Sequence, residues 1–177
     1  MGSYIALLRG INVGGHNKIP MAGLREACAE LDWTGVRTYI QSGNLVFEAT
    51  GKPAALEQAL EKKIAARFGF APAVIVRTAA QLKRLAQANP FEEESAKEPH
   101  WVLVGLAKQA LKSGAAEAIE AKGKAGERVA EAGGALWFHY PAGVGTSKLT
   151  PALIDRAAGS PVTARNWRTL TTLIAML

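Results

Sequence analysis

The fold of this chain is decided by the stretch Val36-Arg37-Thr38-Tyr39-Ile40-Gln41-Ser42-Gly43-Asn44-Leu45-Val46-Phe47. Both arms are rich in β-branched and aromatic residues, which favour strands. Between them, Gln41 to Asn44 read as a turn in which Gly43 supplies the positive φ that such a turn needs. The pattern predicts two antiparallel strands, at 36–40 and 45–47, joined in a tight hairpin.

A helix is predicted on each side of this hairpin. Residues 21–32 carry an apolar stripe at helical spacing and follow Pro20, which suits the start of a helix. Residues 53–68 carry a four-residue apolar ladder that ends at Gly69. Strands at 4–9 and 73–77 complete the order strand, helix, strand, strand, helix, strand. This is the split βαβ pattern of ferredoxin-like folds, with two helices on one face of an antiparallel four-stranded sheet.

The second half of the chain is expected to repeat this order, although Gly123 and Gly126 interrupt the pattern of its first hairpin strand. Strands are expected at 101–104, 127–131, 135–140 and 161–165, and helices at 79–89, 107–120, 150–159 and from Asn166 onward. We therefore predict an α+β protein of two ferredoxin-like (βαββαβ) halves in one compact chain. The predicted domains are residues 1–89, which carry a Gly-rich loop, and residues 100–177, joined by an acidic linker at 90–99.

Composition and cysteine usage place the chain among ordinary globular proteins. Hydrophobic residues make up 49% and charged residues 20% of the sequence, and no apolar stretch approaches the roughly 18 residues that cross a bilayer. We therefore expect no membrane partner. The single cysteine, Cys28, has no partner for an internal disulfide and lies on the apolar stripe of the first predicted helix. We expect a buried thiol and a cytoplasmic location.

The net charge of +6 is unevenly distributed. Residues 1–88 hold eleven Lys and Arg against six acids, whereas residues 89–177 hold ten against nine. The basic excess therefore belongs to the half that carries the Gly-rich loop. A basic surface favours anionic partners, although a modest surplus is also common on a solvated surface.

The Gly-rich loop, Arg9 to Lys18, follows the first predicted strand and contains three glycines and no acid. Glycines let several backbone N–H groups converge on one point, which suits an anion. The loop is not a Walker A motif, because His16 and Asn17 stand where Lys and Ser or Thr are required. We predict a looser anion site in this loop. The alternative is that the glycines only shape a long strand-to-helix connection.

Polar residues elsewhere are candidate partners of this loop. The hairpin turn is rich in hydrogen-bonding side chains, and we hypothesise that it lies at the same end of the sheet as the loop. Ser147-Lys148 resembles a nucleophile–base pair, but adjacent residues on a loop seldom face each other, so Lys148 is the better anion contact. Arg165 and Asn166 stand where a helix N-terminus could hold phosphate, with a plain N-cap at Asn166 as the alternative. The predicted ligand-binding residues are Arg9, Asn12, Gly14, Gly15, His16, Lys18, Gln41, Ser42, Asn44, Lys148, Arg165 and Asn166.

The expected function is the binding of a small anionic, phosphorylated ligand, and three alternatives remain open. An RNA-binding module would stack bases on Tyr39 and Phe47, although the RNP signature is absent. An enzyme of unassigned transfer or hydrolysis chemistry would need a base, for which His16 is the candidate beside the loop. A pure interaction protein would use the loops as structural devices. The three histidines lack metal-ligand spacing, so we predict no metal and no cofactor. The oligomeric state stays open.

Three separated motifs resemble the signature of DUF1697, a bacterial family known as a domain of unknown function. They are Leu8-Arg9-Gly10-Ile11-Asn12-Val13-Gly14-Gly15 with Lys18, Thr38-Tyr39-Ile40-Gln41-Ser42-Gly43-Asn44, and Thr163-Ala164-Arg165-Asn166-Trp167-Arg168-Thr169. The resemblance runs through the whole chain. It implies a cytoplasmic protein of about this length with mixed α and β structure, and it implies no reaction, cofactor or catalytic residue.

Overall fold

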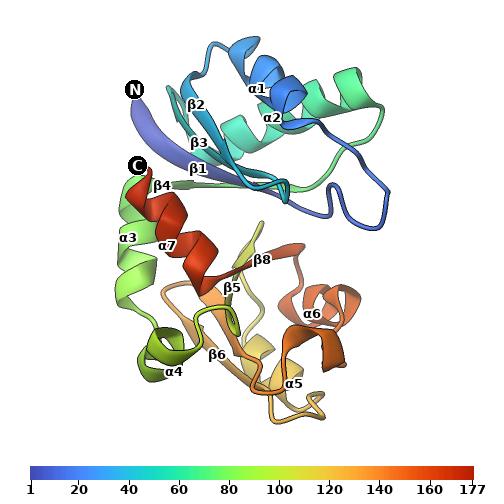
Figure 1. The fold of residues 1–177 in the computed structure, drawn as a ribbon, viewed down its shortest axis with the longest axis vertical. Coiled ribbons are helices and arrows are strands. Elements are labelled where there is room, and N and C mark those ends of the chain that lie inside the picture. Colours follow the sequence, from blue (N-terminus) through green and yellow to red (C-terminus); the bar gives the residue numbers. More distant parts are fainter. The chain divides into compact units, whose positions relative to one another are not determined.

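The computed structural model describes all residues, 1–177, as a mixed α+β chain with two separate four-stranded antiparallel sheets (Figure 1). The chain divides into unit 1, Met1–Leu82 with Leu173–Leu177, and unit 2, Lys83–Thr172. Unit 1 contains β1 (Gly2–Leu8), α1 (Met21–Ala29), β2 (Thr34–Tyr39), β3 (Asn44–Ala49), α2 (Pro53–Phe68) and β4 (Val74–Thr78). Unit 2 contains α4 (Glu92–Lys97), β5 (Val102–Ala107), α5 (Ala115–Glu120), β6 (Arg128–Ala132), β7 (Ala135–His139), the 3-10 turn Val144–Thr146, α6 (Pro151–Ala158) and β8 (Val162–Asn166). The helices α3 (Ala79–Gln87) and α7 (Trp167–Ala175) follow β4 and β8 and contribute residues to both units.

The two sheets have the same topology. Their strand orders are β2-β3-β1-β4 and β6-β7-β5-β8, so the first strand of each βαββαβ sequence is central. In unit 1, Ile5 pairs antiparallel with Val46 on one side and with Arg77 on the other. The predicted pair of ferredoxin-like halves is confirmed.

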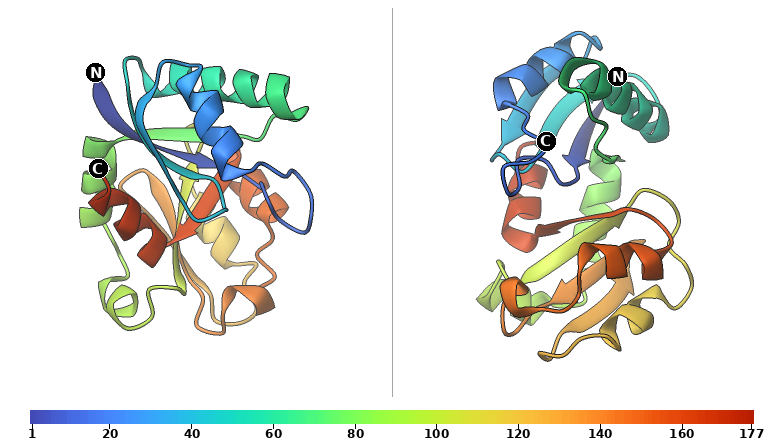
Figure 2. Two further views of the ribbon diagram at one scale, coloured as in Figure 1. Left: turned by 45° about the horizontal axis from the view of Figure 1, so that its top comes forward. Right: turned by 90° about the vertical axis from the view of Figure 1, so that its right-hand side faces the viewer.

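The core of unit 1 lies between its sheet and the helices α1 and α2 (Figures 1 and 2). Alternation along β1 directs Tyr4, Ala6 and Leu8 to this face, because successive residues of a strand point to opposite sides. Phe47 of β3 stacks on Trp33 with ring centroids 4.0 Å apart. Cys28 is buried in the same core, and burial raises the pKa of its thiol to about 12.

The aromatic residues suggested for RNA stacking do not share a face of the sheet. Tyr39 pairs with Asn44, and Phe47 lies three residues farther along β3, so the two rings point to opposite sides. Phe47 is buried under the helices, and the Arg37 guanidinium donates a hydrogen bond to the Met176 carbonyl. These side chains therefore do not form the stacking platform that the RNA-binding alternative required.

In unit 2, α5 and α6 cover one face of the second sheet (Figure 1). All of β7 is buried, and Phe138 faces the helices together with Tyr140, their rings 5.9 Å apart. The helix α6 begins as its sequence predicts. Pro151 occupies the first turn, and the Thr150 hydroxyl accepts a hydrogen bond from Leu153 N (3.2 Å).

Two predicted elements are wrong. The helix expected at 107–120 covers only Ala115–Glu120, because the segment before it makes hydrogen bonds with a distant part of the chain. Lys108 N donates to Pro161 O (3.0 Å), and Lys112 N donates to Ala158 O (3.0 Å). These bonds override the helix propensity of the alanine-rich sequence.

The acidic segment at 90–99, expected as a linker, contains the helix α4. Three glutamates in its first turn favour a helix through the helix dipole, and the buried Ser95 accepts a hydrogen bond from Asn89 Nδ2 (2.8 Å). The division of the chain into unit 1 and unit 2 falls within α3 and α7. The assignment of residues 1–89 and 100–177 as the two domains stays a prediction. None of the helices combines the length and apolar character needed to cross a membrane.

Candidate functional site

The tip of the Gly-rich loop is a miniature hairpin. Asn12 N donates to Asn17 O (3.1 Å), and His16 N donates to Val13 O (3.0 Å). Gly14 and Gly15 occupy the turn with φ of 58° and 78°, and positive φ at both central residues is typical of a type I′ turn. The turn geometry thus accounts for both glycines, and the amides of Asn12 and His16 are used within the loop.

The Asn12 side chain ties this hairpin to the rest of unit 1. Its Oδ1 accepts a hydrogen bond from Ile19 N (2.9 Å), and its Nδ2 donates to Ile19 O (3.0 Å) and to Gln41 O (2.9 Å). Three hydrogen bonds from one amide hold both arms of the loop and the β2–β3 turn together. The loop and the turn therefore lie at the same end of the sheet, which is the neighbourhood that the sequence hypothesis required.

The β2–β3 turn is packed closely against the end of β1. Leu8 N donates to Gly43 O (2.8 Å), and a Cβ at position 43 would lie 2.7 Å from Leu8 Cβ and 2.9 Å from Ile11 Cδ1. The buried Asn44 donates through Nδ2 to Tyr39 O and to Ser42 Oγ, both at 2.9 Å. The side chains of Ser42 and Asn44 thus build the turn.

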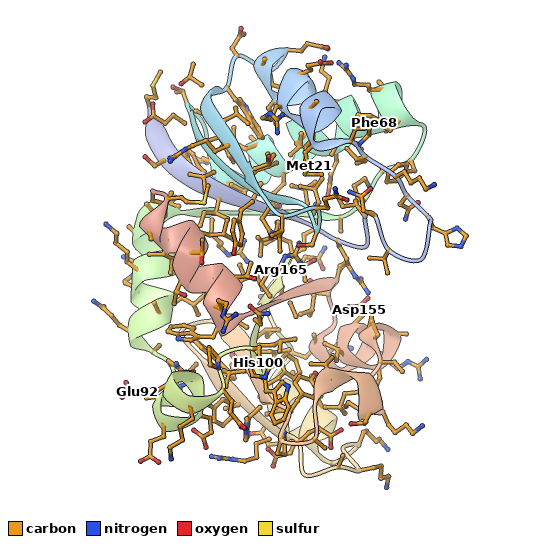
Figure 3. All side chains as sticks on the ribbon, viewed as in Figure 1. Met21, Phe68, Glu92, His100, Asp155 and Arg165 are labelled. Atoms are coloured by element: carbon orange, nitrogen blue, oxygen red, sulfur yellow. The ribbon has the colours of Figure 1, made fainter.

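A pocket of about 330 Å³ opens between this loop, the turn and the start of α1. It is lined by Asn12, Gly15, Lys18, Ile19, Pro20, Met21 and Gln41. Figure 3 shows Met21 at the beginning of α1. Four of the predicted ligand-binding residues, Asn12, Gly15, Lys18 and Gln41, are brought together here.

The N-terminus of α1 gives this pocket a positive electrostatic end. Pro20 is the N-cap and offers no side-chain cap, and the first turn contains no acid. The first intrahelical hydrogen bond runs from Leu24 N to Pro20 O (3.0 Å), so the N–H groups of the preceding helical residues lack intrahelical acceptors. Lys18 adds an exposed ammonium group. Both features favour an anion.

Comparison with known proteins identifies the family. A family model described as "Protein of unknown function (DUF1697)" matches residues 1–137. The chain belongs to this family. The matched region includes the first two of the three motifs that carry the resemblance and ends before the third, which begins at Thr163.

Among solved structures, this DUF1697 protein is similar to the conserved bacterial protein SP0830 from Streptococcus pneumoniae. The two are 22% identical, and the alignment covers 99% of this chain and 98% of that one with a TM-score of 0.73. At this identity the likeness shows the fold alone. No curated protein matches the sequence.

Several predicted residues of unit 1 lie outside the pocket lining of the DUF1697 protein. The backbone N–H of Arg9 donates to Ala73 O (2.9 Å), and Gly14 and His16 are exposed on the miniature hairpin. Ser42 and Asn44 are engaged within the β2–β3 turn. A ligand-binding role for these five residues stays a prediction.

The predicted residues of unit 2 also have structural partners. Asn166 Oδ1 accepts a hydrogen bond from Thr169 N (2.8 Å) and caps α7, which was the alternative weighed for this residue. Arg165 donates to Ala164 O (2.9 Å), and burial lowers the pKa of its guanidinium to about 10. Lys148 is exposed. A site shared by these three residues and the loop of unit 1 stays a prediction.

The hydrogen bonds of Ser147 do not favour a catalytic role. Its Oγ donates to Glu127 Oε1 (2.5 Å) and accepts a hydrogen bond from Leu149 N (3.1 Å). The Ser147 hydrogen bond is the largest cause that lowers the pKa of the Glu127 carboxyl. A carboxylate with a lowered pKa is a weak base, so the pair serves to fasten two loops.

Ile40 has an unusual backbone conformation that the sequence did not reveal. It lies at φ 50° directly before Gln41, and the residue is 51% exposed. A β-branched residue at positive φ is a conformational outlier, and such strain often accompanies functional sites. No sequence signal could have found it, because Ile40 reads as the last residue of a regular strand.

Proposed function

We propose that this protein binds a small phosphorylated or otherwise anionic ligand in the pocket between the Gly-rich loop, the β2–β3 turn and the start of α1. The observation that carries the proposal is the lining itself. It combines an uncapped helix N-terminus with Lys18 and contains no carboxylate. Phosphate oxygens are strong acceptors, and helix N–H groups together with an ammonium group are donors that suit them.

Each lining residue would have a different role in binding the anion. Lys18 would act as a point charge on the anion, and the side chain of Gln41 would supply a neutral donor. Asn12 would shape the pocket, because both hydrogens of its amide are already donated to backbone carbonyls.

Binding is favoured over catalysis by the chemistry of the lining. The lining side chains supply donors and one cation, but no imidazole, thiol or carboxylate that could serve as a general base. His16, the base considered for an enzyme, is not among them. We place the protein in the cytoplasm as part of this proposal, because its one cysteine is a buried free thiol.

A thermal-shift series with inorganic phosphate, sugar phosphates and nucleoside monophosphates tests the proposal. At least one phosphorylated compound is expected to raise Tm in a concentration-dependent way, because binding to the native state stabilises it. Lys18→Ala and Gln41→Glu should abolish the rise. Gln41→Glu is nearly isosteric and exposed, so it puts a negative charge at the pocket with little effect on folding.

Lys62→Ala is the matched control, because Lys62 is an exposed lysine on α2 of the same unit and does not line the pocket. It should leave the rise unchanged. The proposal is overturned if no phosphorylated compound stabilises the wild type, or if Gln41→Glu responds as the wild type does.

A further inference from the structure

A second pocket, of about 380 Å³, lies between α5 and α6 of unit 2. It is lined by Ala118, Lys122, Thr150, Ala152, Leu153, Arg156 and Ala157. The methyl groups of three alanines and the side chain of Leu153 make an apolar floor. Lys122, two residues after the end of α5, and Arg156, on α6, supply two exposed cations. We call this site the α5–α6 groove.

Two acids beside these cations, Glu120 and Asp155, make hydrogen bonds elsewhere. Glu120 Oε2 accepts a hydrogen bond from Val129 N (2.7 Å), and Asp155 Oδ1 accepts one from Val162 N (3.0 Å). Figure 3 shows Asp155 on α6. Each carboxylate thus satisfies the backbone of an adjacent strand. Lys122 and Arg156 share the α5–α6 groove without a carboxylate among the lining residues, so both would attract an anion bound there.

The equivalent helix pair of unit 1 carries ion pairs and an aromatic contact between its helices. Between α1 and α2, Lys63 Nζ lies 3.1 Å from Glu30 Oε2, and Arg67 bonds to Glu30 (2.7 Å) and to Glu26. The Phe68 ring packs on Gly23, where a Cβ would lie 3.2 Å from Cζ. The two units therefore differ at this position. In unit 1 ion pairs and an aromatic ring lie between the helices, whereas in unit 2 the pocket has an apolar floor and two cations with no carboxylate in its lining.

From this contrast we propose that the α5–α6 groove binds a small amphiphilic anion, an apolar chain that carries one carboxylate head. The chain would lie on Ala118, Leu153 and Ala157, where it removes apolar surface from water. The carboxylate would accept hydrogen bonds from Arg156 and Lys122, of which arginine offers a planar fork that matches a carboxylate. This site is separate from the anion pocket of unit 1.

Octanoate, below its micelle concentration, is the probe, and binding is measured by titration calorimetry and by shifts of backbone amide resonances. Octanoate should bind and shift the amides of α5 and α6. Acetate, which has the head alone, and octanol, which has the tail alone, should bind at least tenfold more weakly. Lys122→Gln and Arg156→Gln should each weaken octanoate binding about twofold to fivefold, within the range expected for an exposed ion pair.

Lys124→Gln is the matched control, because Lys124 is an exposed lysine two residues from Lys122 and does not line the groove. It should bind octanoate as the wild type does. So should Lys18→Ala, which separates this result from the proposed anion pocket. The inference is overturned if octanol or acetate binds as tightly as octanoate. It is also overturned if the double variant Lys122→Gln/Arg156→Gln retains full affinity for octanoate, or if the shifted amides lie outside α5 and α6.

Discussion

The Asn12 side-chain amide donates a hydrogen bond to the backbone carbonyl of Gln41, 2.9 Å away, and so joins the Gly-rich loop to the β2–β3 turn across 29 residues of sequence. The same side chain exchanges two hydrogen bonds with Ile19, two residues before the start of α1. One residue therefore holds together the three segments that line the proposed anion pocket.

Asn12→Ala should destabilise the protein by about 3 kcal/mol. The variant loses three hydrogen bonds of about 1 kcal/mol each, of which water replaces a part, and alanine at positive φ adds backbone strain. Asn17→Ala is the control. Asn17 has nearly the same φ, 50° against 55°, but its side chain makes one hydrogen bond, to Gly10 O (3.2 Å). Urea denaturation of both variants should show Asn12→Ala less stable by about 1–2 kcal/mol. Equal losses would mean that Asn12 does not tie the segments.

Gly43→Ala should cost about 3 kcal/mol or more, because the new methyl group meets Leu8 and Ile11 at less than 3 Å and also bears the cost of positive φ. Gly69→Ala measures the cost of positive φ without the packing clash. Gly69 has φ 80° against 81° for Gly43, yet a Cβ there meets nothing within 4 Å. Its cost should be about 1 kcal/mol, from backbone strain alone. The difference in unfolding free energy between the two variants measures the contribution of close packing at Gly43. Equal stability of the two variants would show that packing at Gly43 contributes nothing.

Ile40→Asn should raise stability by about 1 kcal/mol, because asparagine tolerates the left-handed conformation that strains isoleucine. The expected result is a higher Tm in calorimetry with an unchanged fold by circular dichroism. Val13→Asn is the companion variant, because Val13 is also exposed but has no positive φ. It should change stability by less than about 0.5 kcal/mol. A gain shared by both variants would trace to surface polarity and not to strain at Ile40.

Ser147→Ala should destabilise the protein by about 1–2 kcal/mol at neutral pH, because Glu127 loses a charge-assisted hydrogen bond. The pKa of Glu127 is lowered in the folded state from its ordinary value of 4.5, first by Ser147 and then by the Ala125 amide. A lowered carboxyl pKa contributes stability that is complete above pH 4.5 and is lost as pH falls through the folded-state pKa. The difference between wild type and variant should therefore be constant above about pH 5.5 and shrink below pH 4.5. Chemical denaturation across that range measures it, and a difference that grows toward acid pH would contradict the assignment.

The sequence alone predicted most of the fold, because the deciding signals are local. The α2 ladder between Pro53 and Gly69, the Thr150-Pro151 start of α6 and the 36–47 hairpin all depend on backbone preferences of a few adjacent residues. The alanine-rich segment at 107–120 was wrongly predicted as one helix because its structure depends on long-range contacts. Its first part is held by hydrogen bonds to residues 158–161, about 50 positions away, which no local pattern encodes.

The candidate site shows the same division. The sequence predicted four of the residues that line the pocket, Asn12, Gly15, Lys18 and Gln41, because a loop rich in glycine and amide side chains and a polar turn can be recognised from residue types alone. Only the tertiary structure decided the role of each residue. Gly14 and Gly15 form a turn, and the Asn12 amide donates its hydrogens to backbone carbonyls. Lys18 and Gln41 line a pocket at the N-terminus of α1. The physical reason is that hydrogen bonds and charges act over a few ångströms of space, and the direction of a side chain depends on partners that folding brings from distant parts of the chain.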